Sequence, residues 1–334
     1  MKDKIYMFPM RTVALLQEKN PYVYNLSTAL LTNFDIVNYG KKIKGGVLDV
    51  WKYLFKAKYF YFNWIEDVSF FQAPFFISFF FISKLLGKRI IWTHHNRQPH
   101  KAGKWINIFI IKLLTKYADF IIVHTDESYH ILNADRQNPR IKYFFHPFFT
   151  RTIEVPVQTE KKYDLLIWGT IRKSKGIEDF MEYLLRSEKT DLYKIKIIGR
   201  FQDVNYYNEF IHRYNGKFIS IENNFISKEE LKILHQEAKY IFFPYTGLSV
   251  LNSGALITSL PLGTPIIGPN VGAFKEASTK GLIYSYGDFK DVLDYVDHKI
   301  DDLPNFNSLI SQYIKKYTWD NFSLYLKDEL NKHK

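Results

Sequence analysis

The sequence predicts an α/β protein with two consecutive, doubly wound parallel sheets. Short apolar runs alternate with longer amphipathic segments along the chain, which is typical of strands joined by crossover helices. The alternation pauses once, over the polar, proline-containing residues 151–164, and then restarts. With 334 residues, the chain is also long for a single core. We therefore expect two Rossmann-like domains facing each other across a cleft.

The first half alternates apolar and amphipathic segments five times. Its apolar runs are rich in β-branched and aromatic residues and predict strands at 4–8, 58–63, 89–93, 119–124 and 142–145. Helical spacing predicts helices at 22–31, 46–55, 74–86, 102–117 and 127–134. The first predicted domain covers residues 1–155.

The second half repeats the pattern over residues 156–315. Strands are predicted at 164–168, 193–198, 217–222, 239–243 and 264–268, and helices at 176–187, 204–214, 228–237 and 252–260. The tail, residues 316–334, has apolar residues at helical spacing after "YTWDNF". We expect a final helix there.

Composition narrows the possible partners of this chain. The formal net charge is +12, which attracts nucleic acid, anionic membrane or phosphorylated small molecules. There are no cysteines, which excludes disulfides and thiolate chemistry and fits a reducing cytoplasm. The N-terminus lacks a long apolar segment of the secretory type. The apolar segment 70–87 is interrupted by Gln72, Pro74 and Lys84, so we expect a buried or membrane-touching helix rather than a spanning one.

Basic residues and glycines surround the end of the first strand of the second half. Gly169 follows this strand, and Arg172, Lys175 and Gly176 precede the next helix. Cations beside a helix start, where backbone N–H groups are free, suit an anion. The alternative is an ordinary solvated basic turn.

A neutral stretch runs from Pro244 to Gly272, with no acidic or basic residue in 29 positions. Asn252 and Ser253 are good N-cap types, and Gly254 allows close approach to the backbone. A diphosphate would explain the absence of carboxylates, and simple burial is the alternative. The chain has no D-x-D, P-loop or other metal or phosphate motif. We therefore expect neither a metal nor another cofactor.

In the first half, polar side chains follow two predicted strands. His94, His95 and Asn96 come after 89–93, with His100 close behind, and Glu66 and Asp67 follow 58–63. Histidine or carboxylate can act as a general base. Structural histidines or a zinc site are the alternatives for the first group, and helix capping is the alternative for Asp67.

The segment 101–117 has lysines at positions 101, 104, 112 and 116, and the apolar residues Trp105, Ile106 and Phe109 lie between them. This is a basic amphipathic pattern that could rest on an anionic membrane surface together with the Phe-rich segment before it. An ordinary helix packed on its sheet is the alternative. On the membrane interpretation, the protein is cytoplasmic and peripheral on the inner face of the membrane.

Three stretches, "GTIRKSKGIEDF", "FFPYTGLSVLNSGALITSLPLGTPIIGPNVG" and "IIWTHHNRQPH", together resemble nucleotide-sugar glycosyltransferases of the GT-B fold. They look most like bacterial β-mannosyltransferase-like enzymes of polysaccharide assembly, and the resemblance covers nearly the whole chain. It implies a donor such as GDP-mannose or a UDP-sugar, bound by the second domain, and a saccharide acceptor, free or lipid-linked, bound by the first domain. It also implies that the final helix, 316–334, crosses back to the first domain.

The resemblance also implies roles for individual residues. The donor diphosphate and sugar would be bound by Arg172, Lys175, Tyr245, Asn252, Ser253 and Gly254, and the nucleoside by Gly199, Arg200, Phe225 and Ile226. The Trp64-x-Glu66 segment matches a motif of the group, so Glu66 is the first candidate for the base, followed by His95 and Asp67. His94, Asn96 and His100 would contact the acceptor or the sugar.

One departure from the large retaining family of this fold concerns its two glutamates, eight positions apart. The matching positions hold Val250 and Thr258, which predicts an inverting transferase instead. A nucleotide-sugar epimerase or another GT-B enzyme is the alternative. A nucleic-acid-binding protein is a weaker one, because most aromatic residues fall inside predicted strands rather than along a basic surface.

Overall fold

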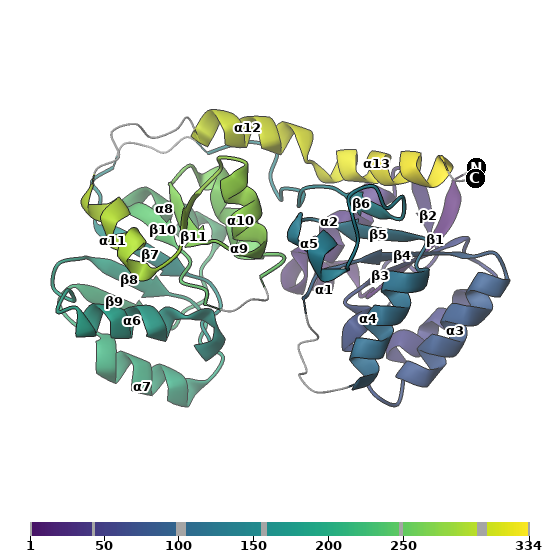
Figure 1. Ribbon diagram of the computed structural model, residues 1–334, viewed down its shortest axis with the longest axis horizontal. Helices are drawn as coiled ribbons and strands as arrows, with labels where there is room; N and C mark the ends of the chain where they lie inside the picture. The colour runs from purple at the N-terminus through teal and green to yellow at the C-terminus, as the bar shows by residue number, and fades with distance from the viewer. Residues whose placement is uncertain are drawn as a thin grey trace. The chain divides into compact units, whose positions relative to one another are not determined.

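A computed structural model describes residues 2–41, 44–97, 105–154, 159–246, 250–298 and 306–332 of the chain (Figure 1). It divides into two compact units. The N-terminal unit comprises Met1–Phe149 and Lys316–Lys334, and the C-terminal unit comprises Thr150–Lys315. The sequence placed the first domain boundary at residue 155, a few residues further along the chain.

The N-terminal unit contains a six-stranded parallel sheet in the order β2-β1-β3-β4-β5-β6. Its strands are β1 Asp3–Phe8, β2 Phe34–Ile36, β3 Tyr59–Asn63, β4 Arg89–Thr93, β5 Phe120–Val123 and β6 Ile141–Tyr143. Strand β3 is buried at every position because helices cover both faces of the sheet. Phe60 and Phe62 point into one hydrophobic cluster, and Tyr59 and Tyr61 point into the other.

Two helical layers supply these clusters. The layer that packs on Phe60 and Phe62 consists of η1 Gly46–Tyr53, α3 Ala73–Leu85 and α4 Trp105–Tyr117. The opposite layer includes α2 Pro21–Leu30 and the last helix, α13 Trp319–Asn331. Of the shorter helices, α1 Val13–Lys19 packs in this opposite layer, whereas η2 Ile65–Asp67 and α5 Glu127–Ile131 place Ile65 and Tyr129 in the cluster of Phe60 and Phe62. The C-terminal helix is therefore part of the core of the N-terminal unit.

The C-terminal unit contains a second six-stranded parallel sheet, in the order β12-β11-β10-β7-β8-β9. Its strands are β7 Tyr163–Trp168, β8 Ile195–Ile198, β9 Ile219–Glu222, β10 Ala238–Phe242, β11 Ile266–Pro269 and β12 Tyr284–Tyr286. The helices are η3 Lys173–Lys175, α6 Ile177–Arg186, α7 Val204–Tyr214, α8 Lys228–Glu237, α9 Gly254–Ser259, η4 Leu260–Leu262, α10 Gly272–Thr279, α11 Phe289–Asp297 and α12 Phe306–Lys316.

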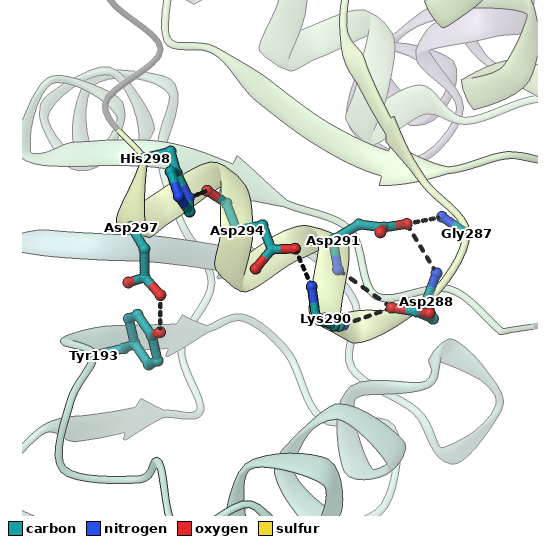
Figure 2. A network of polar contacts seen from close by, with 8 residues as sticks. All are labelled: Tyr193, Gly287, Asp288, Lys290, Asp291, Asp294, Asp297 and His298. Atoms are coloured by element: carbon teal, nitrogen blue, oxygen red, sulfur yellow. Dashed lines mark hydrogen bonds and ion pairs between the residues drawn. The ribbon is translucent and has the colours of Figure 1, made fainter.

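Helix α11 is held by a network of polar contacts (Figure 2). Asp288 caps the helix by accepting from the N–H groups of Lys290 and Asp291, at 2.8 and 3.2 Å. The Asp291 carboxylate accepts in return from the Asp288 N–H, which completes a capping box. At the other end of α11, the Tyr193 hydroxyl donates to Asp297 at 2.8 Å. These acidic side chains therefore have structural partners within the C-terminal unit.

All ten strands predicted from the sequence are present, and the predicted α/β class is correct. Each sheet has one additional edge strand, β2 or β12, of only three residues. The helix expected at 46–55 is a 3₁₀ helix, and the helix expected at 252–260 ends as α-helix at Ser259. Helices α1, α10, α11 and α12 were not predicted.

Candidate functional site

The C-terminal sheet changes winding direction between β7 and β10. The chain runs outward from β7 through β8 to β9, and then returns to β10 on the other side of β7. In open parallel sheets, ligands bind at the carboxyl ends of the strands beside such a switch point. Residues that follow β7 and β10 are therefore the first place to look for a site in this unit.

The turn after β7 packs closely on the segment that follows β10. Gly176 has a φ of +69°, and a Cβ there would lie 2.1 Å from the carbonyl oxygen of Pro244. The Thr246 hydroxyl donates to Asp179 at 3.1 Å, which joins the same two segments through α6. Glycine at 176 is thus required for the two loops of the switch point to meet.

This junction brings together Lys175 and Tyr245, two of the residues that the resemblance implied for the donor. The Lys175 ammonium lies 5.0 Å from the centroid of the Tyr245 ring, and Tyr245 is buried. Burial, with the nearby Arg172 guanidinium as a second cause, lowers the pKa of Lys175 to about 8. Burial raises the pKa of Tyr245 to about 12, so its hydroxyl stays neutral.

Arg172 lies in the same turn and is exposed. In the described part of the chain, no carboxylate lies within ion-pair distance of the exposed Arg172 or of the half-buried Lys175. Two neighbouring cations without an acidic partner form a positively charged site that an anion would stabilise.

The start of α9 lies beside this pair. Ser253 is the N-cap, and its hydroxyl accepts from the Leu256 N–H at 3.2 Å. It also lies close enough to Tyr245 to lower the pKa of that phenol, against the larger effect of burial. A Cβ added at Gly254 would meet no atom of the described residues within 4 Å, so the backbone there borders open space among them. Asn252 precedes the cap and is half-buried.

The predicted nucleoside residues follow β8 and β9 on the adjacent side of β7. Gly199 has a φ of +153°, and a Cβ there would lie 1.8 Å from the Gly169 carbonyl oxygen. Arg200 is exposed, and its carbonyl accepts from Ile171 at 2.9 Å, so the exits of β7 and β8 are joined. Phe225 is 87% exposed, and Ile226 beside it is half-buried.

Val250 and Thr258 flank the start of α9. The Val250 carbonyl accepts from Ala273 at 2.8 Å, and Thr258 donates its hydroxyl to the Gly254 carbonyl at 2.8 Å. Both positions are therefore used for local structure, and neither supplies a carboxylate.

The N-terminal sheet has its own switch point between β1 and β3. Asn63 is the last residue of β3, and its amide donates to the carbonyl of Phe8, the last residue of β1, at 3.3 Å. This hydrogen bond spans the switch point. Trp64 follows in the left-handed region, with a φ of 51°, and Glu66 then lies in η2 with its side chain buried. The Asn96 amide donates to the Glu66 carboxylate at 3.2 Å, and Asn107 of α4 donates to the Glu66 carbonyl.

His95, the second predicted base, is also buried. Its ring stacks on Trp64 with centroids 4.0 Å apart, and its Nε2 lies 3.0 Å from the Asn63 amide oxygen. Burial lowers the pKa of His95 well below its usual value and that of His94 to about 4. Both imidazoles are therefore neutral near pH 7. The structure brings His95, Asn96 and Glu66 to one sheet edge.

Three residues that the sequence analysis did not select, Tyr22, His124 and His146, lie around His95. Tyr22 meets the His95 ring edge-on at 4.7 Å, and its hydroxyl lies 2.9 Å from the His124 Nε2. His146 packs against Tyr22 and His124, and burial lowers the pKa of His146 to about 3 and that of His124 to about 4. His124 is the last residue of one predicted strand and His146 directly follows another, and this position at a strand end is the signal that could have found them.

The remaining predicted residues have no described side chain. His100 lies outside the described residues, and Asp67 is placed in η2 without its side chain. Across the described ranges, no group of three His, Cys, Asp or Glu side chains is arranged to hold a metal ion. Among the helices that the structure describes, none has the length and apolar character needed to cross a membrane.

Comparisons with known proteins identify the fold. No protein-family model matches the sequence, and no curated protein matches it. Solved structures do match over nearly the whole of both chains. Anabaena Alr3699/HepE, crystallised in complex with UDP, is 10% identical with a TM-score of 0.63, and the alignment covers 99% of this chain and 100% of that one.

Two further solved structures agree. A glycosyltransferase from Rickettsia africae is 12% identical, with a TM-score of 0.63 and coverage of 99% and 98%. AviGT4, a glycosyltransferase of avilamycin A biosynthesis, is 14% identical, with a TM-score of 0.60 and coverage of 100% and 98%. The chain thus has the two-domain α/β architecture of GT-B structures, as the sequence predicted.

Proposed function

We propose that this chain is a glycosyltransferase that moves a hexose from a nucleotide-diphosphate sugar to a saccharide acceptor. GDP-mannose and UDP-sugars are the donors we favour, and a lipid-linked saccharide of cell-surface glycan assembly is the acceptor class. The observation that carries the proposal is the pair Arg172 and Lys175, two cations without a described acidic partner at the switch point of the C-terminal sheet.

A diphosphate fits the surroundings of this pair. Its negative charge would neutralise Arg172 and Lys175, which have no carboxylate partner among the described residues. The open backbone at Gly254 leaves room for it beside them. Ser253 and Tyr245 add hydroxyl groups at the same place. The exposed Phe225 and the loop at Gly199 lie after the adjacent strands, where a nucleoside would extend.

Two structural neighbours named as glycosyltransferases, and one that binds UDP, support this assignment. A shared fold does not by itself establish an activity, because function depends on the residues of the site. The proposal therefore rests on the Arg172–Lys175 pair and uses the neighbours as support.

We infer a single displacement that inverts the anomeric centre. The acceptor hydroxyl oxygen would attack the anomeric carbon while the bond to the β-phosphate oxygen breaks, and its electron pair leaves on the diphosphate. Arg172 and Lys175 would stabilise that charge. The acceptor proton would pass to a base, for which we favour Glu66, and the acceptor hydroxyl would take the position that the Asn96 amide now occupies at its carboxylate.

A thermal-shift screen tests the proposed donor class. Nucleoside diphosphates and nucleotide-sugars at about 100 times their dissociation constant should stabilise the C-terminal unit by roughly 2.7 kcal/mol. We expect a response to a UDP or GDP ligand and none to the free sugars. Failure of every nucleoside diphosphate and nucleotide-sugar to shift unfolding would contradict the proposal.

An activity assay then separates transfer from the alternatives. A transferase releases the nucleoside diphosphate at a rate that rises with a saccharide acceptor, whereas an epimerase converts the donor without one. We also propose that no metal is needed, so a chelator should leave turnover unchanged. Loss of activity in a chelator, with recovery on adding magnesium or manganese, would contradict that part alone.

A further inference from the structure

Helix α3 exposes an uncharged apolar stripe. The outward positions of the helix are Pro74, Phe75, Ser78, Phe81, Ile82 and Leu85, and Phe71, in the turn before the helix, continues the same three- or four-residue spacing. Phe71 and Leu85 are 84% and 86% exposed. The outward face of a helix on a water-soluble surface is normally polar or charged, so this stripe is unusual.

The neighbouring helix α4 continues the same surface. Its outward positions are Trp105, Ile108, Phe109, Lys112 and Lys116, apolar at the start of the helix and basic towards its end. Trp105 is 67% exposed, and of the six tryptophans it is the one classed as exposed. Eleven of the nineteen exposed large hydrophobic residues in the described ranges lie between Phe70 and Tyr117.

The two helices run side by side in the same direction (Figure 1). The rings of Phe70 and Trp105 are 6.3 Å apart at their starts, and those of Phe81 and Tyr117 are 6.3 Å apart near their ends. The outward residues of α3 and α4 therefore form one continuous surface, which we call the α3–α4 face. The face consists of the outward residues of α3 with Phe71, and of the outward residues of α4 from Trp105 to Lys116.

The segment of sequence that carries this face is basic, although its Lys84 and Arg97 pair with Asp119 and Glu127 outside the segment. From Val68 to Ala118, 51 residues include eight Lys or Arg and no Asp or Glu, in a chain with 34 acidic residues in total. Lys112 and Lys116 are on the face itself. A second copy of the same face would meet like charge, whereas an anionic lipid headgroup would meet opposite charge.

We propose that the α3–α4 face binds the surface of an anionic lipid bilayer. Aromatic and aliphatic side chains beside lysines are the composition of helices that lie in the membrane interface, where rings insert between headgroups and lysines pair with phosphates. This inference does not depend on the proposed catalytic function. It accounts for large exposed side chains that no other feature of the described residues uses.

The face is also connected to the candidate site of the same unit. The outward side of α4 begins at Trp105, and its inward side carries Asn107, which donates to the Glu66 carbonyl. Because both helices begin at the carboxyl edge of the sheet, the apolar end of the face lies on the same edge as Glu66 and His95. A lipid-linked acceptor held in the bilayer would then be presented close to Glu66.

Vesicle flotation of the full chain tests the proposal. Binding is compared on phosphatidylcholine vesicles with and without phosphatidylglycerol, at low and high salt. We expect binding to the anionic vesicles that salt weakens, because exposed charges are screened within about 10 Å at 0.1 M. The double variants Phe71→Ser/Phe75→Ser and Lys112→Glu/Lys116→Glu should each lower the partition coefficient by on the order of tenfold or more.

Matched controls keep the result specific. Phe55→Ser removes an exposed phenylalanine of the same unit outside the face, and Lys228→Glu reverses an exposed lysine of the C-terminal unit. Both should bind vesicles as the unchanged protein does. All variants replace exposed side chains, so their thermal unfolding should match the unchanged protein, and nucleotide binding measured in the same preparations reports separately on the proposed function.

Tryptophan fluorescence locates the contact. Brominated lipids should quench the bound protein, and Trp105→Phe should abolish most of that quenching without abolishing binding. Three results would overturn the proposal: no binding to anionic vesicles, equal binding to neutral and anionic vesicles at every salt concentration, or binding unaffected by both double variants. Self-association that Phe71→Ser/Phe75→Ser removes, in a protein that ignores vesicles, would assign the face to a protein partner instead.

Discussion

The Lys175 ammonium lies 5.0 Å from the centre of the Tyr245 ring, at the junction of the loops that follow β7 and β10. The two residues are 70 positions apart in sequence. They meet because β7 and β10 are adjacent parallel strands, whose carboxyl ends lie at the same edge of the sheet. Arg172 is the second cation there, and it contributes to the lowered pKa of Lys175. Most of the predictions below concern this junction.

Removing either cation should weaken donor binding without unfolding the protein. A hydrogen bond to a charged group contributes about 1.5–3 kcal/mol, so Arg172→Ala and Lys175→Ala should each raise the dissociation constant for a nucleoside diphosphate roughly 10- to 150-fold. Lys173→Ala is the matched control, since Lys173 lies in the same turn but its ammonium faces the Tyr206 ring at 5.3 Å. Isothermal titration calorimetry checks all three, and an effect of Lys173→Ala as large as that of Lys175→Ala would contradict the assignment.

Donor affinity should fall as the pH rises through about 8. Lys175 has its pKa lowered to about 8 in the unliganded protein, so it is charged below that value and loses its proton above it. A bound diphosphate favours the charged form, so binding above pH 8 requires proton uptake and weakens by up to about tenfold per pH unit. Lys175→Arg should remove this dependence, because guanidinium stays charged. A flat profile between about pH 7 and 9 for the unchanged protein would contradict it.

Two glycines should respond differently to alanine. At Gly254 a Cβ meets nothing within 4 Å, so Gly254→Ala should leave the free energy of unfolding unchanged or raise it by up to about 1 kcal/mol, while it weakens donor binding by filling the space that the ligand needs. At Gly199 the φ of +153° and the Gly169 carbonyl 1.8 Å from a Cβ forbid a side chain, so Gly199→Ala should destabilise by about 2 kcal/mol or more. Urea unfolding and donor titration distinguish the two effects. Full donor affinity in Gly254→Ala would place the ligand elsewhere.

The buried histidines should make the N-terminal unit sensitive to acid. Burial lowers the pKa of His124 to about 4 and that of His146 to about 3, below the usual 6.5. The unfolded state therefore binds more protons below pH 6.5, so stability is complete above that value and is lost as the pH falls towards 4. A single such group changes the free energy of unfolding by up to about 1.4 kcal/mol per pH unit in this range.

Replacing one histidine tests this. His124→Gln should reduce the slope of unfolding free energy against pH between about 6.5 and 4, whatever it does to stability at neutral pH. His130→Gln, at an exposed histidine of the same unit, is the control and should leave the slope unchanged. Equal slopes for all three proteins would show that the histidine cluster does not govern acid stability.

The sequence predicted the fold well because the strongest pattern in it is the alternation of buried strands and amphipathic helices. It missed β2 and β12 because three-residue edge strands such as "FDI" and "YSY" carry too little pattern. Lys175 could be chosen as a basic residue after a predicted strand, whereas Tyr245 was assigned to the same site through the resemblance alone. The contact of Gly176 with the Pro244 carbonyl could not be predicted, because it depends on the strand order, which the sequence does not state.

The burial of Glu66 and His95 in the N-terminal unit could not be predicted from the sequence either. Glu66 and His95 were chosen as polar residues after strands, which are usually accessible, yet both are buried. Their cover includes Trp64, which stacks on His95, and Asn96, which donates to Glu66, and each pair joins the segment after β3 to the segment after β4. These contacts between distant positions depend on the pairing of β3 with β4 and on the left-handed backbone of Trp64, which no residue pattern signals.

The stereochemical course of transfer gives the last prediction. An α-linked donor should yield a β-linked product, because the positions that hold paired glutamates in the retaining family are Val250 and Thr258, whose polar groups serve local hydrogen bonds. A single displacement needs a base on the acceptor, and Glu66→Gln should lower kcat by about 10²- to 10⁴-fold while it preserves the Asn96 contact and the fold. The anomeric carbon–proton coupling of the product, measured by NMR beside these kinetics, checks both parts.

A product of retained configuration would overturn the displacement mechanism, whereas an inverted product from a fully active Glu66→Gln enzyme would keep inversion and move the base. His95 is then the next candidate, because its imidazole is neutral near pH 7 and lies at the same sheet edge, and His95→Ala should abolish transfer in that case.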